Sequence, residues 1–250
     1  MEGQVVPFQP PGKPQGQGHP GLLSPRVPFV EAVALTVRPS VPSPRILAFH
    51  KPVGVEVTRP KSLTVSREHG PTVYDLLPPE FHSAGWMPVG RLDKDSSGLL
   101  LFVREGPLVA RLQKPGTLEK VYETTVRGPV EDHHLVALHK GVGTDLGVLR
   151  ADQARILGTE GKLSRVRLIL REGRNRQIRR LFNALRDDRL GKPLKVMALR
   201  RVRFGPQALD LGEGDWRFLS ESEEGELLAA ANIIPEGNGS SWIMAIHKRF

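Results

Sequence analysis

The chain contains no cysteine among its 250 residues. This absence excludes disulfide bonds, cysteine-ligated zinc and thiolate nucleophiles, and it suits a reducing compartment. Long apolar runs are also missing, because none reaches the roughly 18 residues that a membrane-spanning helix needs. The first residues, Met-Glu-Gly-Gln, lack the charged and then apolar layout of a secretory signal. We therefore expect a cytoplasmic protein without membrane contact.

The same absences remove several kinds of chemistry. Methylation of a pyrimidine through a covalent thioether needs a cysteine, and zinc-dependent base deamination needs cysteine and histidine ligands. Residues 158–164, Gly-Thr-Glu-Gly-Lys-Leu-Ser, contain a Gly-Lys pair but lack the G-x-x-x-x-G-K-[ST] spacing of a phosphate-binding loop. We therefore do not expect nucleotide hydrolysis.

Positive charge is abundant and unevenly distributed. The formal net charge is +9, and the calculated pI is about 10.2. Residues 162–203 hold fifteen lysines or arginines against three acids, whereas residues 210–236 hold eight acids against one arginine. A basic block inside a folded region is typical of a surface that binds a nucleic acid. We expect RNA as the partner of a monomeric chain.

Composition divides the chain into three parts. Residues 1–44 contain ten prolines and five glycines, which predicts a disordered tail. Residues 45–220 form the predicted catalytic domain. Residues 221–250 are first acidic and then polar, and we interpret them as a second tail that ends in a flexible segment.

Hydrophobic periodicity predicts a mixture of strands and helices without strict alternation. The expected strands are 45–50, 99–103, 120–127, 164–170 and 196–204, and the expected helices are 72–77, 107–113, 131–140 and 175–186. This order favours an α+β fold with a largely antiparallel mixed sheet, flanking helices and a central cleft. Three histidines lie on the helix 131–140, but no carboxylate or thiol has ligand spacing to them, so we expect no metal site.

The first candidate site is the loop 90–98, Gly-Arg-Leu-Asp-Lys-Asp-Ser-Ser-Gly, which leads into the apolar run Leu-Leu-Leu-Phe-Val. A carboxylate loop held against a buried strand is well placed for catalysis, because loops carry chemistry on a rigid scaffold. A surface turn with ordinary turn aspartates fits these residues equally well.

The second candidate site is the segment 173–186, which opens with a turn and continues as a helix with Asn175 as the expected N-cap. Ile178, Leu181, Phe182 and Leu185 fall at helical spacing and form one apolar stripe. Arg179 flanks this stripe, where an arginine can enter a partly buried site, while other arginines point away from it. A solvated basic helix face remains the simpler interpretation of this segment taken alone.

Together these segments resemble RsuA-type pseudouridine synthases. The resemblance covers residues 45–220 and rests on the loop 90–98, on 119–122 (Glu-Lys-Val-Tyr) and on 172–180 (Glu-Gly-Arg-Asn-Arg-Gln-Ile-Arg-Arg). The stretch 50–55 is similar to the family's Asn-Lys-Pro-x-Gly element, with His50 in place of asparagine, and 201–206 and 214–219 are similar to its closing elements. The chain resembles the branch without an N-terminal RNA-binding module of the S4 type. The resemblance implies the pseudouridine synthase fold.

The resemblance also implies three catalytic residues. Asp93 would be the essential carboxylate, which either attacks C1′ of a uridine or removes its C2′ proton. Arg179 would lie beside it, and Tyr122 would stack on the uracil. The sequence does not choose between the two routes for Asp93.

The resemblance further implies a set of RNA-binding residues around the flipped nucleotide. These residues are Arg91, Lys120, Arg174, Asn175, Arg176, Gln177 and Arg180. The expected activity is conversion of a uridine in ribosomal RNA, of the large subunit, without cofactor or metal. Two alternatives remain open, namely a transfer-RNA-directed synthase and a non-catalytic ribosome-assembly factor on the same scaffold.

Overall fold

The computed structural model describes residues 46–59, 70–235 and 242–244. The predicted N-terminal tail, and most of the predicted flexible end, therefore lie outside the described residues. All described residues belong to one compact unit. Within them, every helix is too short or too polar to cross a membrane.

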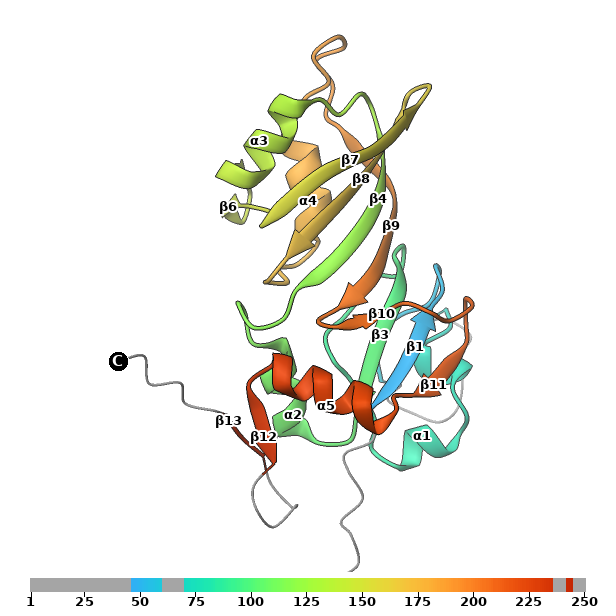
Figure 1. Cartoon of the computed structure of the whole chain (residues 1–250). Helices are drawn as coiled ribbons and strands as arrows, with labels where there is room; N and C mark the ends of the chain where they lie inside the picture. Colours follow the sequence, from blue (N-terminus) through green and yellow to red (C-terminus); the bar gives the residue numbers. More distant parts are fainter. Residues whose placement is uncertain (1–45, 60–69, 236–241, 245–250) are drawn as a thin grey trace, which may run out of the picture. The chain divides into compact units, whose positions relative to one another are not determined.

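A mixed sheet of nine strands is the main element of this unit (Figure 1). Its strands follow the order β11 (Trp216–Phe218), β1 (Leu47–Lys51), β3 (Ser97–Val103), β9 (Lys195–Phe204), β4 (Lys120–Arg127), β8 (Leu163–Leu170) and β7 (Gln153–Glu160), with β2 (Met87–Pro88) on β3 and β10 (Gln207–Ala208) on β9. All these pairs are antiparallel except β3 with β9, which pair in parallel through two residues of each strand. The predicted α+β class with a largely antiparallel sheet is confirmed.

Strand β3 is buried on both faces, which explains its unbroken apolar sequence. Leu100 and Phe102 belong to one hydrophobic core, and Leu99 and Leu101 belong to a second. Because successive side chains of a strand face opposite sides, a strand covered on both faces needs apolar residues at every position. The strand that follows the loop 90–96 is therefore rigidly held.

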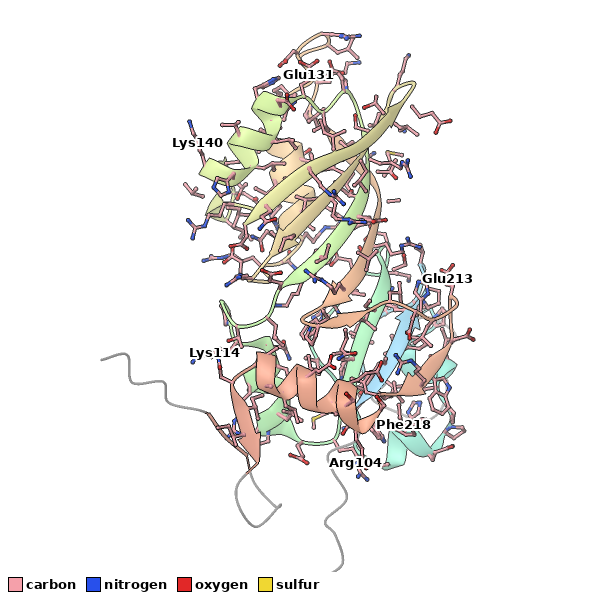
Figure 2. The ribbon with its side chains drawn as sticks, in the orientation of Figure 1. Arg104, Lys114, Glu131, Lys140, Glu213 and Phe218 are labelled. Carbon is pink, nitrogen blue, oxygen red and sulfur yellow. The ribbon has the colours of Figure 1, made fainter. Side chains whose placement is uncertain are left out.

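Helices cover both faces of the sheet. The first core includes residues of α3 (Asp132–Lys140) and α4 (Gln177–Ala184), and the second includes residues of α2 (Gly106–Gln113) and α5 (Glu221–Ala230). Figure 1 shows α3 and α4 beside β7 and β8, and in Figure 2 the side chains of Glu131 and Lys140 mark the two ends of α3. The remaining elements are short: η1 (Val73–Leu76), α1 (Glu80–Ser83), β5 (Val142–Thr144), β6 (Gly147–Leu149), β12 (Ile233–Pro235) and β13 (Trp242–Met244).

Residues 221–230 form helix α5, whereas the acidic composition predicts a tail. Ser220 caps this helix by accepting a hydrogen bond from the backbone N of Glu223, whose carboxylate lies 2.7 Å from the guanidinium of Arg217. Hydrogen bonds that Arg217 and the backbone N of Ser220 donate to the Glu223 carboxylate lower its pKa to about 2. The acidic residues are therefore capping groups and ion-pair partners of a folded helix. The apolar positions between them are too few for hydrophobic periodicity to predict this helix.

Helix α5 is also part of the core. Leu227 and Leu228 are buried in the second core, and the carboxylate of Glu224 accepts a hydrogen bond from the backbone N of Ile46 at 2.6 Å. The folded part of the chain thus continues past residue 220.

Gly98 allows β3 and β9 to meet. Its φ is +116°, and a Cβ at this position would lie 2.5 Å from the backbone N of Arg201 and closer still to the carbonyl oxygen of that residue. We expect Gly98→Ala to lower the free energy of unfolding by at least about 3 kcal/mol, because backbone strain and a backbone overlap act together. Gly54→Ala is the matched control, since Gly54 has a φ of +87° but open space around it, and it should cost about 1 kcal/mol. Urea denaturation measures both, and equal losses would contradict the close approach.

Candidate active site

The loop 90–96 carries Asp93 and Asp95. It is hydrogen-bonded to the buried side chain of Lys51, the last residue of β1. The Lys51 side chain is completely buried. Its Nζ donates to the carbonyl oxygen of Ser96 at 2.6 Å and to the carbonyl oxygen of Pro52 at 2.7 Å. Burial lowers the pKa of Lys51 to about 8, although Asp95 and Asp93 attract the cation. Sequence reasoning missed this residue, and the signal for it is a lysine directly after an apolar strand.

Helix α4 brings the basic segment to this loop. Ile178, Leu181 and Phe182 are buried in the first core, as the predicted stripe requires, whereas its fourth residue, Leu185, is the C-cap of the helix and only partly buried. Arg179 therefore projects from the edge of the buried face, and only 13 % of its side chain is exposed.

The helix begins differently from the prediction. Arg176, rather than Asn175, is the N-cap, and it adopts a left-handed conformation with φ 50° and ψ 30°. The Asn175 side chain accepts a hydrogen bond from Arg180 at 3.3 Å instead of capping the helix. A non-glycine residue in this region is strained, and such strain is concentrated at functional sites.

The Arg179 guanidinium joins two segments that are 84 residues apart. Its Nη2 lies 3.1 Å from Oδ2 of Asp95 and donates to the carbonyl oxygen of Asp95 at 2.9 Å and to Oγ of Ser96 at 3.2 Å. Its Nε lies 3.8 Å from Oδ2 of Asp93, which is an ion-pair distance without a hydrogen bond. This Nε is buried and has no hydrogen-bond partner among the described residues. The shortest ion pair of Arg179 is thus with Asp95, and no described residue donates a hydrogen bond to the Asp93 carboxylate.

Two neighbouring hollows surround this ion-pair cluster. The smaller, of about 460 Å³, is lined by Asp93 together with Arg91 and residues of the segment 53–58. The larger, of about 900 Å³, is lined by Arg179 and by residues of α4, of the hairpin β5–β6 and of the start of β9. Asp95 and Arg176 line both hollows, so the two are adjacent. The larger one is called the α4 cleft below.

Tyr122 is the most buried of the three predicted catalytic residues. It lies on β4, opposite Leu168 of β8, and only 8 % of it is exposed. Its ring belongs to the first core, and it is not among the residues that line the two hollows.

The predicted RNA-binding residues fall into three groups. Arg91, Arg174 and Arg176 are exposed, and Arg91 and Arg176 line the hollow that contains Asp93. Asn175 and Arg180 hold each other, and Arg180 also forms an ion pair with Asp145 of the hairpin β5–β6. The remaining two, Lys120 and Gln177, are buried.

Gln177 has a structural role in this loop. Its side-chain oxygen accepts a hydrogen bond from the backbone N of Arg174 at 3.0 Å, and its amide donates to Glu172 at 2.6 Å and to the carbonyl of Arg150 at 3.1 Å. These bonds use both hydrogens of the buried amide, so Gln177 supports the arginine loop, and its RNA contact stays a prediction.

Lys120 likewise points into the protein. It is 6 % exposed, and its Nζ lies 5.4 Å from the centre of the Phe204 ring and next to the buried Arg201. Burial, together with the charge of the neighbouring Arg201, lowers the pKa of Lys120 to about 8. The position of Lys120 therefore does not support the predicted RNA contact.

We expect Lys120→Met to leave RNA affinity unchanged. The free energy of unfolding at pH 7 should stay equal or rise by up to about 2 kcal/mol, because an apolar side chain replaces a buried cation beside another cation. The folded pKa of about 8 lies below the ordinary value of 10.5, so wild-type stability rises with pH between these values as the folded chain releases the proton. Any advantage of the variant should therefore shrink above pH 8. Urea denaturation from pH 6 to pH 9.5 and RNA titrations measure both effects, and weaker RNA binding would restore the contact.

His133, His134 and Asp188 form the described group that comes nearest to a metal site. Both ring nitrogens of His134 are engaged, because Nδ1 accepts from the backbone N of Glu131 at 3.0 Å and Nε2 lies 2.8 Å from the carbonyl oxygen of Arg186. A metal ion would have to displace one of these bonds. The cluster therefore anchors α3 to the segment after α4.

Comparison with known proteins identifies relatives of this chain. Residues 45–184 match the family model described as RNA pseudouridylate synthase. The chain is 35% identical over 199 residues to ribosomal large subunit pseudouridine synthase B of Vibrio vulnificus and 36% identical over 195 residues to the protein of that name from Escherichia coli K12. Each alignment covers 77% of this chain but only 57% and 62% of the relative, respectively.

A solved structure described as a pseudouridylate synthase has a similar fold. Its TM-score is 0.59 at 28% sequence identity, and the match covers 73% of each chain. The matched family segment contains both the carboxylate loop and helix α4.

Proposed function

We propose that this chain, which belongs to the family of RNA pseudouridylate synthases, converts a uridine of ribosomal RNA to pseudouridine. One observation carries the proposal: the Asp93 carboxylate lines a hollow and has no hydrogen bond among the described residues, and Arg179 approaches it from a distant segment. The names of the relatives favour large-subunit ribosomal RNA as the substrate. A monomer in the cytoplasm is part of the proposal.

The reaction moves a glycosidic bond without any net gain or loss of atoms other than one exchanged proton. The C1′–N1 bond breaks, the uracil turns, a C1′–C5 bond forms, and the hydrogen on C5 leaves as a proton while N1 takes up a proton from the solvent. Asp93 is proposed to act on the sugar, either by bonding to C1′ or by taking the C2′ proton. Both routes require a carboxylate with an accessible oxygen, which Asp93 provides with 28 % of its side chain exposed.

Arg179 is proposed to position this carboxylate. Its bonds to Asp95 and Ser96 hold the loop, while its buried Nε faces Asp93 at 3.8 Å without a partner. The guanidinium is held at Nη2 by these bonds and at Nη1 by a 3.4 Å hydrogen bond to the carbonyl oxygen of Val196. Its Nε can then close the remaining hydrogen bond to Asp93 when substrate displaces water from the hollow.

The remaining predicted residues take supporting roles in the proposal. Arg91, Arg174 and Arg176 are exposed cations that can pair with phosphates near the reacting uridine. Tyr122 is proposed to stack on the uracil, which requires the flipped base to reach the edge of the first core.

Loss of the C5 hydrogen supplies the test. Purified protein is mixed with an unmodified large-subunit rRNA transcript that carries tritium at C5 of its uridines. We expect about one tritium released per converted site, followed by mapping of that site. A transfer-RNA transcript is treated in parallel, and release from it alone would reassign the substrate. No release from either RNA would contradict the proposed activity.

A further inference from the structure

Two cationic side chains in the α4 cleft have no acidic partner among the described residues. Arg176, Arg179 and Arg180, which also line it, pair with Asp95 or Asp145. Among the described residues, Arg186 and Lys195 line the cleft without any acidic partner, and both are exposed. Free positive charge in this cleft is thus concentrated at these two side chains.

The backbone brings these two cations to one place. Helix α4 ends at Ala184, and the chain after it runs antiparallel to the segment before β9. Arg186 forms a bridge with Pro193, and the backbone N of Leu194 donates to the carbonyl of Leu185 at 3.0 Å. Arg186 and Lys195 therefore flank the same short ladder, which gives a phosphate two cations on a fixed frame.

Apolar side chains line the same cleft. Leu194 and Val196 are buried, whereas Met197 is 44 % exposed although it is a large apolar residue. Asn183, which is exposed on α4, adds an amide that can donate and accept hydrogen bonds. A surface with an exposed methionine, an amide and two unpaired cations has the chemistry that binds an unstacked nucleotide, because the base needs an apolar contact and its phosphate needs positive charge.

The cleft is adjacent to the carboxylate. Asp95 and Arg176 line both hollows, and Arg179 lines the α4 cleft while its Nε faces Asp93. We propose that the α4 cleft is a second nucleotide subsite, which binds the nucleotide next to the reacting uridine through Arg186, Lys195 and Met197. The inference rests on the proposed function. It adds the place at which the enzyme binds the RNA nucleotide beside the target uridine. A volume of about 900 Å³ lies within the range of sites that bind ligands of this size.

The charge of the subsite is tested by Arg186→Gln/Lys195→Gln. Affinity for a fluorescein-labelled single-stranded RNA decamer is measured by anisotropy over a series of salt concentrations. We expect affinity to fall about tenfold at moderate salt, and the slope of log K against log salt to become shallower by about 1.4, because two phosphate contacts are lost. Arg155→Gln/Lys162→Gln is the matched control, since it removes one exposed arginine and one exposed lysine outside the cleft. Equal slopes in the two double variants would overturn the proposal.

The apolar part is tested by Met197→Gln. We expect affinity to fall about fivefold with the salt slope unchanged, because contact area rather than charge is lost. Leu163→Gln is its control, since Leu163 is similarly exposed, at 41 %, but lies at the start of β8 outside the cleft. A loss that the control variant shares would overturn the assignment of Met197 to the base.

Kinetics separate this inference from the proposed function. With the tritiated transcript, Arg186→Gln/Lys195→Gln should raise KM about tenfold and change kcat less than twofold, because the subsite binds RNA away from the reacting bond. An unchanged KM would overturn the inference while leaving the activity established. Absence of release by the wild-type chain would instead contradict the proposed function, whatever the binding titrations show.

Discussion

Asp93→Asn is expected to lower kcat by at least about 10³-fold while RNA affinity stays the same or rises slightly. The amide has the shape of the carboxylate, but it can neither bond to C1′ as an anion nor accept the C2′ proton. Removal of a negative charge from a groove that binds phosphates does not weaken binding. Tritium release under single-turnover conditions measures the chemical step, and anisotropy measures the affinity.

Asp95→Asn is the decisive control for this prediction. Asp95 lies two residues away, it forms the shorter ion pair with Arg179 at 3.1 Å, and half of its side chain is exposed. Its backbone carbonyl and Ser96 Oγ would still hold Arg179, so kcat should fall no more than about tenfold. If Asp95→Asn were inactive and Asp93→Asn active, the catalytic carboxylate would be Asp95.

Arg179→Ala should lower kcat by about 10²-fold to 10³-fold with little change in RNA affinity. The loss of the guanidinium removes two hydrogen bonds to the loop 95–96 and the only described cation within 4 Å of the Asp93 carboxylate. The free energy of unfolding should fall by about 1–2 kcal/mol, a modest amount because the carboxylate partners remain partly hydrated. Arg179→Lys should recover little activity, since one ammonium cannot reach both aspartates and Ser96 at the required angles.

The matched control for Arg179 is Arg174→Ala. Arg174 belongs to the same loop, but 56 % of its side chain is exposed, and its described ion pair is with Glu172 at 3.5 Å. Its loss should raise KM a few-fold and leave kcat intact. If Arg179→Ala weakened RNA binding as much as Arg174→Ala, Arg179 would be a phosphate-binding residue rather than a positioning one.

Local patterns predicted the scaffold of this site well. The run Leu-Leu-Leu-Phe-Val predicted a buried strand, and β3 is covered on both faces. The spacing of Ile178, Leu181 and Phe182 predicted the stripe that turns Arg179 toward the loop. Such patterns work because burial on a strand or a helix face acts on every residue of one short segment.

Other features escaped sequence reasoning for physical reasons. Helix α5 is stabilised by its N-terminal cap and by the Glu224 carboxylate, which accepts a hydrogen bond from the backbone N of Ile46. The helix has few apolar positions, so its hydrophobic periodicity is too weak to predict it. Arg176 is an N-cap with positive φ, although side-chain preference favours Asn175 for capping. The resemblance implies RNA contacts for Gln177 and Lys120, and only the fold shows that both side chains are buried.

The sequence by itself determined the strands and helices next to the site, the excess of positive charge in residues 162–203, and the chemistries excluded by the lack of cysteine. Only the tertiary structure decided which carboxylate the guanidinium of Arg179 contacts most closely, that Lys51 supports the loop from inside, and that Arg186 and Lys195 have no acidic partner among the described residues. Periodicity depends on neighbours a few residues apart, whereas an ion pair depends on distances between segments that meet only after the sheet has formed.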